Sequence, residues 1–185
     1  MISKLIVYAC PTGQLADQIA AYYARSHAEC GPNAAHAYPP HCTLTGFFHD
    51  DVESIPRYKN ALAAALQRAK PQQPTPVITI SDLVIDERFL YLQLDSPWLI
   101  ALIADFAATV DSPSRRDPLR LKDWLHLSLA YEFPPSQYPS LAQLARELVD
   151  ISASVGWQLR LYERYADADW TCHARWELES LSRPQ

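Results

Sequence analysis

The sequence has little glycine, few cysteines and no long apolar run. Only four of its 185 residues are glycine, and no Gly-rich phosphate loop is present, which argues against ATP chemistry. The four cysteines, Cys10, Cys30, Cys42 and Cys172, form no CxxC or zinc-ligand spacing and suggest no disulfide framework. A reducing cytoplasm is therefore the expected location.

An excess of basic charge is also missing, since the formal net charge is -5. That charge argues against a broad basic surface for long nucleic acid, although a few local groups could still hold a small phosphorylated substrate. The apolar run at residues 4–10 is too short for a signal peptide, and no stretch is long enough to span a membrane. With 49% hydrophobic and 20% charged residues, the composition predicts a globular domain with a sizeable core.

The most informative feature is a pattern that occurs twice, about 85 residues apart: His41-Cys42-Thr43-Leu44 and His126-Leu127-Ser128-Leu129. Both copies lie in short apolar runs bounded by breakers, which is typical of strands. Because side chains on a strand alternate between faces, each His shares a face with the hydroxyl residue two positions on. None of the other four histidines is followed two positions on by Ser or Thr, so the pattern is confined to the two predicted strands.

The predicted elements also repeat, as strand, helix, motif strand, helix and strand, with one extra strand at the end. The expected ranges are 4–10, 14–30, 41–48, 55–69 and 77–85 in the first half, then 89–95, 97–110, 124–133, 140–151, 157–165 and 170–181 in the second, with an internal loop at 71–76 and a turn at 166–168. We expect one domain over residues 1–185, with halves of about 1–87 and 88–185. The predicted class is α+β, with two antiparallel sheets facing a cleft and helices outside.

Two histidines that face each other across a cleft can act as a general base and a general acid, because an imidazole titrates near neutral pH. This chemistry suits cleavage of a phosphodiester by water. The hydroxyls of Thr43 and Ser128 would donate hydrogen bonds to the non-bridging phosphate oxygens and stabilise the developing charge. The scheme requires neither a metal nor another cofactor.

The paired motifs resemble those of the 2H phosphoesterase superfamily, which includes RNA-ligase-like and 2',3'-cyclic phosphodiesterase enzymes. The sequence is most similar to the phosphoesterase domain of the ubiquitin-associated and SH3-containing suppressors of T-cell receptor signalling. The resemblance extends over most of the chain, including Tyr8, Pro11-Thr12-Gly13, Cys30-Gly31, Asn33, Ala35-His36, Pro40-His41, Thr43-Leu44, Phe47-Phe48, Leu125-His126, Leu129-Ala130-Tyr131 and Phe133.

The resemblance implies a two-lobed, pseudo-symmetric RNA-ligase-like fold and metal-independent hydrolysis of 2',3'-cyclic nucleotides to nucleoside monophosphates. It implies that His41 and His126 are catalytic and that Thr43 and Ser128 bind phosphate. Ser128 stands where Thr is commoner in the family, but it keeps the hydroxyl. The signalling role of those larger proteins is not carried over.

Several further residues are candidates for substrate binding, each with a structural alternative. Phe47 and Trp124 share strand parity with the two histidines and could stack on a nucleobase or serve as cleft-wall aromatics. His36 and Tyr38 lie on the loop that enters the first motif, where binding residues often occur. Arg120 and Lys122 could attract a phosphate or be solvated surface charges. Tyr131 and Cys42 have the opposite parity and are expected in the core; a zinc site from the two histidines and a cysteine lacks closely spaced ligands.

Three functions remain open at this point. The first is a 2',3'-cyclic nucleotide phosphodiesterase, whose substrate is a small nucleotide or an RNA 2',3'-cyclic phosphate end. The second is RNA-end processing or ligation, which would predict a positively charged groove. The third is a non-catalytic nucleotide-binding module, which would need no acid and base pair.

Overall fold

Eight strands form one antiparallel sheet in the computed structural model, which describes residues 1–70, 78–165 and 169–178. The order across the sheet is β4-β5-β6-β2-β1-β7-β8, and β3 also pairs with β1. The strands are β1 (Ile2–Thr12), β2 (Cys42–Thr43), β3 (Phe48–Asp51), β4 (Thr79–Ile85), β5 (Phe89–Asp95), β6 (His126–Tyr131), β7 (Gly156–Arg164) and β8 (Trp170–Leu178). The predicted loop at 71–76, the turn at 166–168 and the end of the last strand lie outside the described residues.

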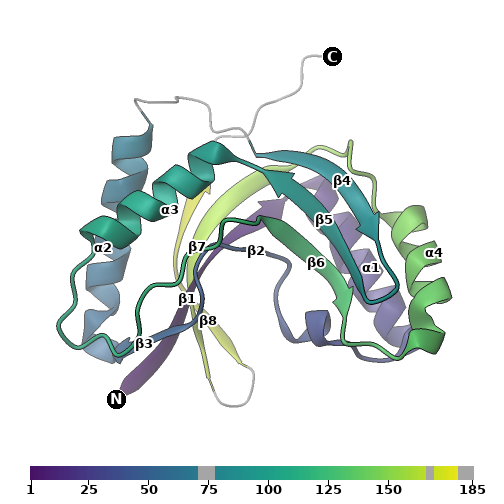
Figure 1. Ribbon diagram of the computed structural model, residues 1–185, viewed down its shortest axis with the longest axis horizontal. Coiled ribbons are helices and arrows are strands. Elements are labelled where there is room, and N and C mark those ends of the chain that lie inside the picture. Colours follow the sequence, from purple (N-terminus) through teal and green to yellow (C-terminus); the bar gives the residue numbers. More distant parts are fainter. Residues whose placement is uncertain (71–77, 166–168, 179–185) are drawn as a thin grey trace.

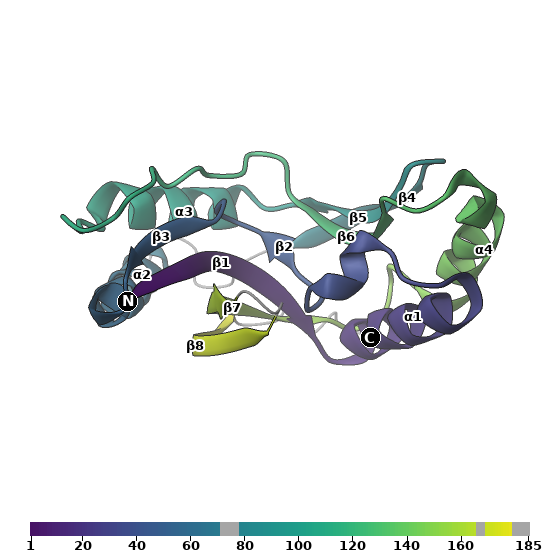
Figure 2. The same cartoon turned by 90° about the horizontal axis from the view of Figure 1, so that it is seen from below.

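In the described part of the chain, four helices pack in pairs at the two ends of the sheet (Figures 1 and 2). They are α1 (Gln14–Cys30), α2 (Ile55–Ala69), α3 (Pro97–Thr109) and α4 (Tyr138–Leu148), and the short 3-10 turns are η1 (Ala34–Ala37), η2 (Val52–Ser54) and η3 (Pro135–Gln137). α1 packs against α4, and α2 packs against α3. The Ser96 side chain caps the start of α3 by accepting a hydrogen bond from the Leu99 N–H at 3.2 Å, whereas Ser54, which precedes α2, makes no side-chain cap.

The strand order is pseudo-symmetric about the β2–β6 pair, with β8 added at one edge. β1 and β2 on one side correspond to β5 and β6 on the other, and β7 corresponds to β4. β4 follows the first motif in the chain but pairs with β5, while β7 follows the second motif but pairs with β1. β4 of the first half therefore belongs to the lobe built on β5 and β6, and β7 of the second half belongs to the lobe built on β1 and β2. The assignment of the chain to one domain with these halves stays a prediction.

The α+β class is confirmed, but the prediction of two separate sheets is wrong in one respect. β2 pairs with β1 on one side and with β6 on the other, through Cys42 opposite Leu127. This contact joins the two lobes into one continuous sheet. The two motifs therefore lie on neighbouring central strands (Figure 1).

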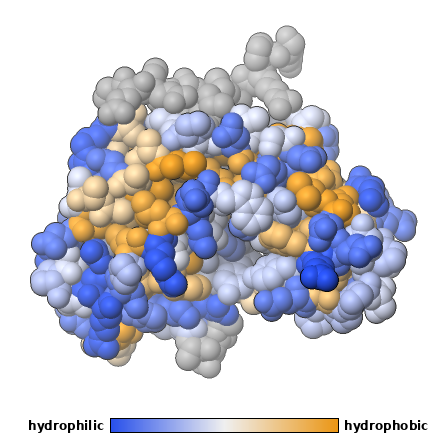
Figure 3. All heavy atoms as spheres, viewed as in Figure 1, coloured by the Kyte–Doolittle hydropathy of each residue, from blue (hydrophilic) through white to orange (hydrophobic). Residues whose placement is uncertain are grey.

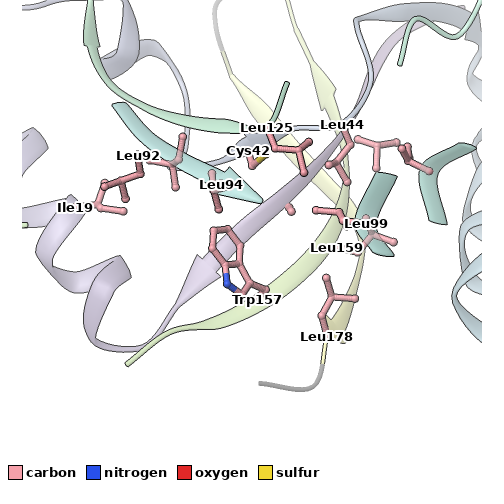
Figure 4. Packing of buried hydrophobic residues seen from close by; sticks show 14 of the residues in the cluster. Ile19, Cys42, Leu44, Leu92, Leu94, Leu99, Leu125, Trp157, Leu159 and Leu178 are labelled. Atoms are coloured by element: carbon pink, nitrogen blue, oxygen red, sulfur yellow. The ribbon is translucent and has the colours of Figure 1, made fainter. Parts of the chain in front are cut away.

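The core lies between one face of this sheet and the helices. Leucines from β5 and β7 pack there beside Cys42 and Leu44 of the first motif and Trp157 (Figure 4). Cys42 is only 1% exposed, so its predicted core position is confirmed. The opposite face of β1 carries a small second cluster of Ile6, Tyr8, Cys10 and Tyr162. The apolar residues of the motifs therefore hold the sheet against the helices, and the polar residues alternate to the other face.

The predicted motif strand at 41–48 is interrupted, and the interruption shapes the site. The N–H of Leu44 and the N–H of Thr45 both donate to the Val7 carbonyl, at 3.0 and 3.4 Å, while the Thr45 hydroxyl accepts from the Val7 N–H at 3.1 Å. Thr45 also forms an isolated antiparallel bridge with Leu121. A side chain that binds the neighbouring backbone competes with the regular ladder, so the strand divides into β2 and β3.

The outer surface is mixed. In the view of Figure 1, hydrophilic side chains surround a larger apolar area over α3 and a smaller one on the right (Figure 3). Among the helices of the described residues, none combines the length and the apolar character needed to cross a membrane.

Candidate active site

The register between β2 and β6 brings the two motifs together. Cys42 and Leu127 are paired and point to the core, so the residues that flank them point to the opposite face. Because the strands are antiparallel, His41 lies beside Ser128 and Thr43 lies beside His126. Each imidazole is thus next to the hydroxyl of the other motif, and the two imidazoles are diagonal neighbours. All four residues line one pocket of about 500 Å³.

His41 is held in one orientation. Its Nδ1–H donates to the Pro39 carbonyl at 2.7 Å, and its ring stacks on Tyr8 with 3.8 Å between centroids. Nε2 consequently carries the lone pair and lies 3.1 Å from the Thr43 hydroxyl. Burial lowers the pKa of His41 to about 4, opposed by the Pro39 hydrogen bond and assisted by the charge of His126. This imidazole is neutral at neutral pH.

His126 is supported by a different set of aromatic residues. Trp124 stacks on it with 4.0 Å between ring centroids, and the Trp124 indole N–H donates to Oε1 of Gln93 at 2.8 Å. Phe89 and Tyr91 meet the same imidazole edge to face, at 5.4 and 5.8 Å. Burial lowers the pKa of His126, the Trp124 carbonyl opposes this effect, and the charge of Lys122 adds to it. Nδ1 of His126 is buried, and no group of the described residues reaches it with full hydrogen-bond geometry.

The backbone of the second motif is anchored from the helix side. The Tyr23 hydroxyl of α1 donates to the Ser128 carbonyl at 2.8 Å. The side chain of His36 is engaged nearby in a capping box at the start of η1. Its Nδ1 accepts from the Asn33 N–H at 3.2 Å, and its Nε2 lies 3.0 Å from the Ser26 hydroxyl.

Aromatic side chains make much of the remaining pocket wall. Tyr38, Phe47, Phe89 and Tyr131 all line it. The Tyr38 hydroxyl accepts a hydrogen bond from Nη1 of Arg164 at 2.8 Å, and the guanidinium also lies 4.8 Å from the centre of the Tyr38 ring. These two contacts fix Tyr38 at the edge of the site.

Two of the predicted substrate-binding residues, Tyr38 and Phe47, therefore reach the pocket together with the four motif residues. Two others have different positions. His36 does not line the pocket, because its ring nitrogens are used to cap η1. Trp124 is 46% exposed, stacks on His126 and is not among the residues that line the pocket, so its role in base stacking stays a prediction.

The prediction that Tyr131 belongs to the core is wrong, because Tyr131 lines the pocket. The pairing of β5 with β6 shifts between Leu90 opposite Ala130 and Tyr91 opposite Ser128, which leaves Leu129 as an extra residue. Such a bulge reverses the alternation beyond it, so Tyr131 returns to the face of His126 and lines the pocket. The sequence carries no local signal for this bulge.

Tyr8 and Phe89 also line the pocket, although the two sequence motifs gave no indication of either. Tyr8 is only 1% exposed and its pKa is raised by burial, followed by the charge of Tyr38. The period-two alternation of β1 could have placed Tyr8 on the open face, since Leu5, Val7 and Ala9 are the core residues. The part of the chain that the structure describes contains no group of three or more His, Cys, Asp or Glu side chains able to hold a metal ion.

The fold of the chain is similar to that of a solved protein, E. coli LigT. The chain matches the crystal structure of E. coli LigT in apo form with a TM-score of 0.54 and 16% sequence identity, covering 97% of this chain and 99% of LigT. It matches E. coli LigT complexed with phosphate with a TM-score of 0.51 and 19% identity over the same shares. No family model matches the chain.

Sequence relatives then indicate a particular group. The chain is 32% identical over 199 residues to Ecdysteroid-phosphate phosphatase of Drosophila melanogaster, covering 87% of this chain and 26% of that protein. It is 30% identical over 164 residues to Ubiquitin-associated and SH3 domain-containing protein B of Homo sapiens, covering 87% of this chain and 25% of the relative. The chain therefore spans about a quarter of the length of these relatives. The predicted LigT-like fold and the predicted sequence relationship to the ubiquitin-associated and SH3 domain-containing proteins are both confirmed.

Proposed function

We propose that this chain is a metal-independent phosphodiesterase that hydrolyses a 2',3'-cyclic nucleotide to a nucleoside monophosphate. The observation that carries the proposal is the cross-strand pairing of the motifs, in which His41 lies beside Ser128 and Thr43 beside His126 in one pocket. A cyclic phosphate between the diagonal imidazoles would have one hydroxyl on each side. The crystal structure of LigT with phosphate supports binding of a phosphate group by this fold.

His41 is the better general base of the pair in this proposal. Its Nδ1–H is committed to the Pro39 carbonyl, so the Nε2 lone pair faces the pocket. Nε2 takes a proton from water as the water oxygen attacks phosphorus. The bond from phosphorus to one ribose oxygen breaks, and protonated His126 gives its proton to that oxygen. The negative charge of the bound phosphate favours the protonated form of His126 and offsets the effect of its burial.

Thr43 and Ser128 then hold the non-bridging oxygens as charge develops in the transition state. The Thr43 hydroxyl lies 3.1 Å from Nε2 of His41. A bound phosphate would draw this hydroxyl toward its oxygen and leave Nε2 free for water. Tyr38 and Phe47 supply an aromatic wall that suits the nucleobase.

The test is hydrolysis of the four 2',3'-cyclic nucleoside monophosphates with EDTA present. Loss of a general acid or base typically costs about 10²- to 10⁴-fold, so we expect His41→Ala and His126→Ala each to lower kcat by that factor. His27→Ala is the matched control, because His27 is exposed on α1 and does not line the pocket. Turnover that survives either pocket substitution would refute the two-histidine mechanism.

The other outcomes separate the alternatives. No turnover of any mononucleotide, with cleavage of RNA that ends in a 2',3'-cyclic phosphate, would favour RNA-end processing. Binding of nucleotides without any turnover would favour a non-catalytic module. The cytoplasmic location stays a prediction.

A further inference from the structure

Two exposed cationic side chains line the candidate active site in addition to the motif residues. They are Arg120 and Lys122, on the segment that leads into β6. Residues two apart on an extended segment project to the same side, and the intervening Leu121 forms the bridge to Thr45. The two cations are therefore presented together on one side of the pocket.

The backbone holds this segment firmly against the interrupted motif strand. The Gly46 N–H donates to the Arg120 carbonyl at 2.7 Å, and the Lys122 N–H donates to the Leu44 carbonyl at 3.1 Å. The Arg120 side chain lies directly over Gly46, where an added Cβ would come within 3.3 Å of Nε. The absence of a side chain at Gly46 thus creates the space that Arg120 occupies.

The charges of the two side chains are available to a ligand. Within residues 1–70, 78–165 and 169–178, neither Arg120 nor Lys122 forms an ion pair with a carboxylate. Asp117 is influenced by Arg120, but its Oδ2 accepts from both the backbone N–H and Nδ1 of His49, at 2.8 and 2.7 Å. A phosphate between the motifs already has two hydroxyls and two imidazoles. The cations are therefore left for a second anionic group.

The two cations are placed against different parts of the site. Lys122 is close enough to His126 for its charge to lower the pKa of that imidazole. Arg120 pairs with Gly46, three residues beyond Thr43, and three residues of chain span at most about 10 Å. Thr43 and the strand position that Arg120 faces are therefore close enough for one nucleotide to bridge them.

We propose that Arg120, assisted by Lys122, binds the 5'-phosphate of the nucleotide whose 2',3'-phosphate lies between the two motifs. The proposal rests on the proposed function for the placement of that first phosphate. The preferred substrate then carries a second phosphate, either a free 5'-monoester or the internucleotide diester of an RNA end. Both present the same phosphate oxygens to the guanidinium, which recognises them through charge-assisted hydrogen bonds.

The first experiment measures binding, so that it does not depend on turnover. Dissociation constants for adenosine 3'-monophosphate and adenosine 3',5'-bisphosphate are compared by calorimetry for the wild type, Arg120→Gln and Arg116→Gln. We expect the wild type to bind the bisphosphate about five- to tenfold more tightly, as one partly exposed charge-assisted contact allows. Arg116→Gln removes the same charge from an exposed residue of the same loop that does not line the pocket.

The ratio of the two dissociation constants decides the result. We expect the ratio to fall to about one to two in Arg120→Gln and to stay at the wild-type value in Arg116→Gln. A wild type that shows no preference for the bisphosphate would overturn the proposal, as would a preference that survives in Arg120→Gln. An equal fall of this ratio in Arg120→Gln and Arg116→Gln would also overturn it, because it would indicate a general effect of charge.

The second experiment identifies the source of the phosphate. kcat/KM is compared for adenosine 2',3'-cyclic phosphate, its 5'-phosphorylated form, and the dinucleotide ApA ending in a 2',3'-cyclic phosphate. A gain for the monoester alone indicates a mononucleotide substrate, and a gain for the dinucleotide indicates an RNA end. If none of the three is hydrolysed while the binding ratio depends on Arg120, the proposed function fails and the phosphate subsite stands.

Discussion

The buried carboxylate of Asp50 allows a prediction of how much one hydrogen bond contributes to the free energy of unfolding. Asp50 of β3 is completely buried and accepts hydrogen bonds from the Tyr58 hydroxyl of α2 at 2.5 Å and from the Ser112 hydroxyl at 2.6 Å. Its Oδ1 also accepts from the Asp51 N–H at 2.7 Å. This network ties the first lobe to the loop that continues to Arg120. Replacing Tyr58 by Phe leaves the buried carboxylate one donor short.

We expect Tyr58→Phe to lower the free energy of unfolding by about 2 kcal/mol, since a hydrogen bond to a charged group contributes about 1.5–3 kcal/mol. For a chain of this length the melting temperature should fall by roughly 4–8 °C. Tyr22→Phe is the matched control. Tyr22 is equally buried, but its hydroxyl has no hydrogen-bond partner among the described residues. Removal of that hydroxyl should cost nothing or stabilise the fold.

Urea unfolding monitored by circular dichroism measures both variants, and equal losses of unfolding free energy for Tyr58→Phe and Tyr22→Phe would refute the reasoning.

The pH dependence of the unfolding free energy gives a second check. Burial raises the pKa of Asp50, but hydrogen bonds from Ser112, Ser114, Tyr58 and the Asp51 N–H outweigh it and lower the pKa to about 2. The stabilisation is therefore complete above the unfolded value near 3.8 and is lost as the pH falls through about 2. The difference between wild type and Tyr58→Phe should shrink over that interval.

Periodicity and breakers predicted the elements whose boundaries are set by local chemistry. β5 occupies Phe89–Asp95 as expected, because the turn at residues 86–88 precedes it and the Ser96-Pro97 cap follows. α1 ends at Cys30, before Gly31 with φ of 86°, a conformation that glycine adopts without strain. Local signals of this kind need no knowledge of the partner strands.

The parts that could not be predicted depend on contacts between distant segments. The break after β2 arises because Thr45 binds the Val7 backbone and pairs with Leu121. The bulge at Leu129 is visible only in the pairing with β5. Both features were invisible to a strict period of two, and the bulge is the reason that Tyr131 was assigned to the wrong face. The union of two expected sheets likewise depends on a single long-range pair, Cys42 with Leu127.

In the candidate site too, local sequence predicted some features, while others depend on contacts between distant segments. Alternation alone predicted that each histidine shares a face with its hydroxyl residue, and the structure has all four in one pocket. It did not predict which neighbours would be used for support. His36 and Trp124 have the sequence features of binding residues, but one caps η1 and the other stacks on His126. A side chain near a site can be required to hold the site without touching a ligand, and only packing separates the two roles.

Two further predictions test the chemistry of the motifs. Ser128→Ala should lower kcat by about 10²-fold, because it removes one donor to the transition-state charge, whereas Ser128→Thr keeps the hydroxyl and should retain most activity. A loss of similar size in both variants would exclude a role for the hydroxyl. The pH profile of kcat/KM should rise through the pKa of His41 at about 4, below which the base is protonated. It should fall before the pH reaches 6.5, because burial lowers the pKa of His126 below that ordinary value and the free enzyme then loses the acid. A maximum above pH 7 for the cyclic nucleotide would show that the two imidazoles do not form the acid and base pair of the free enzyme.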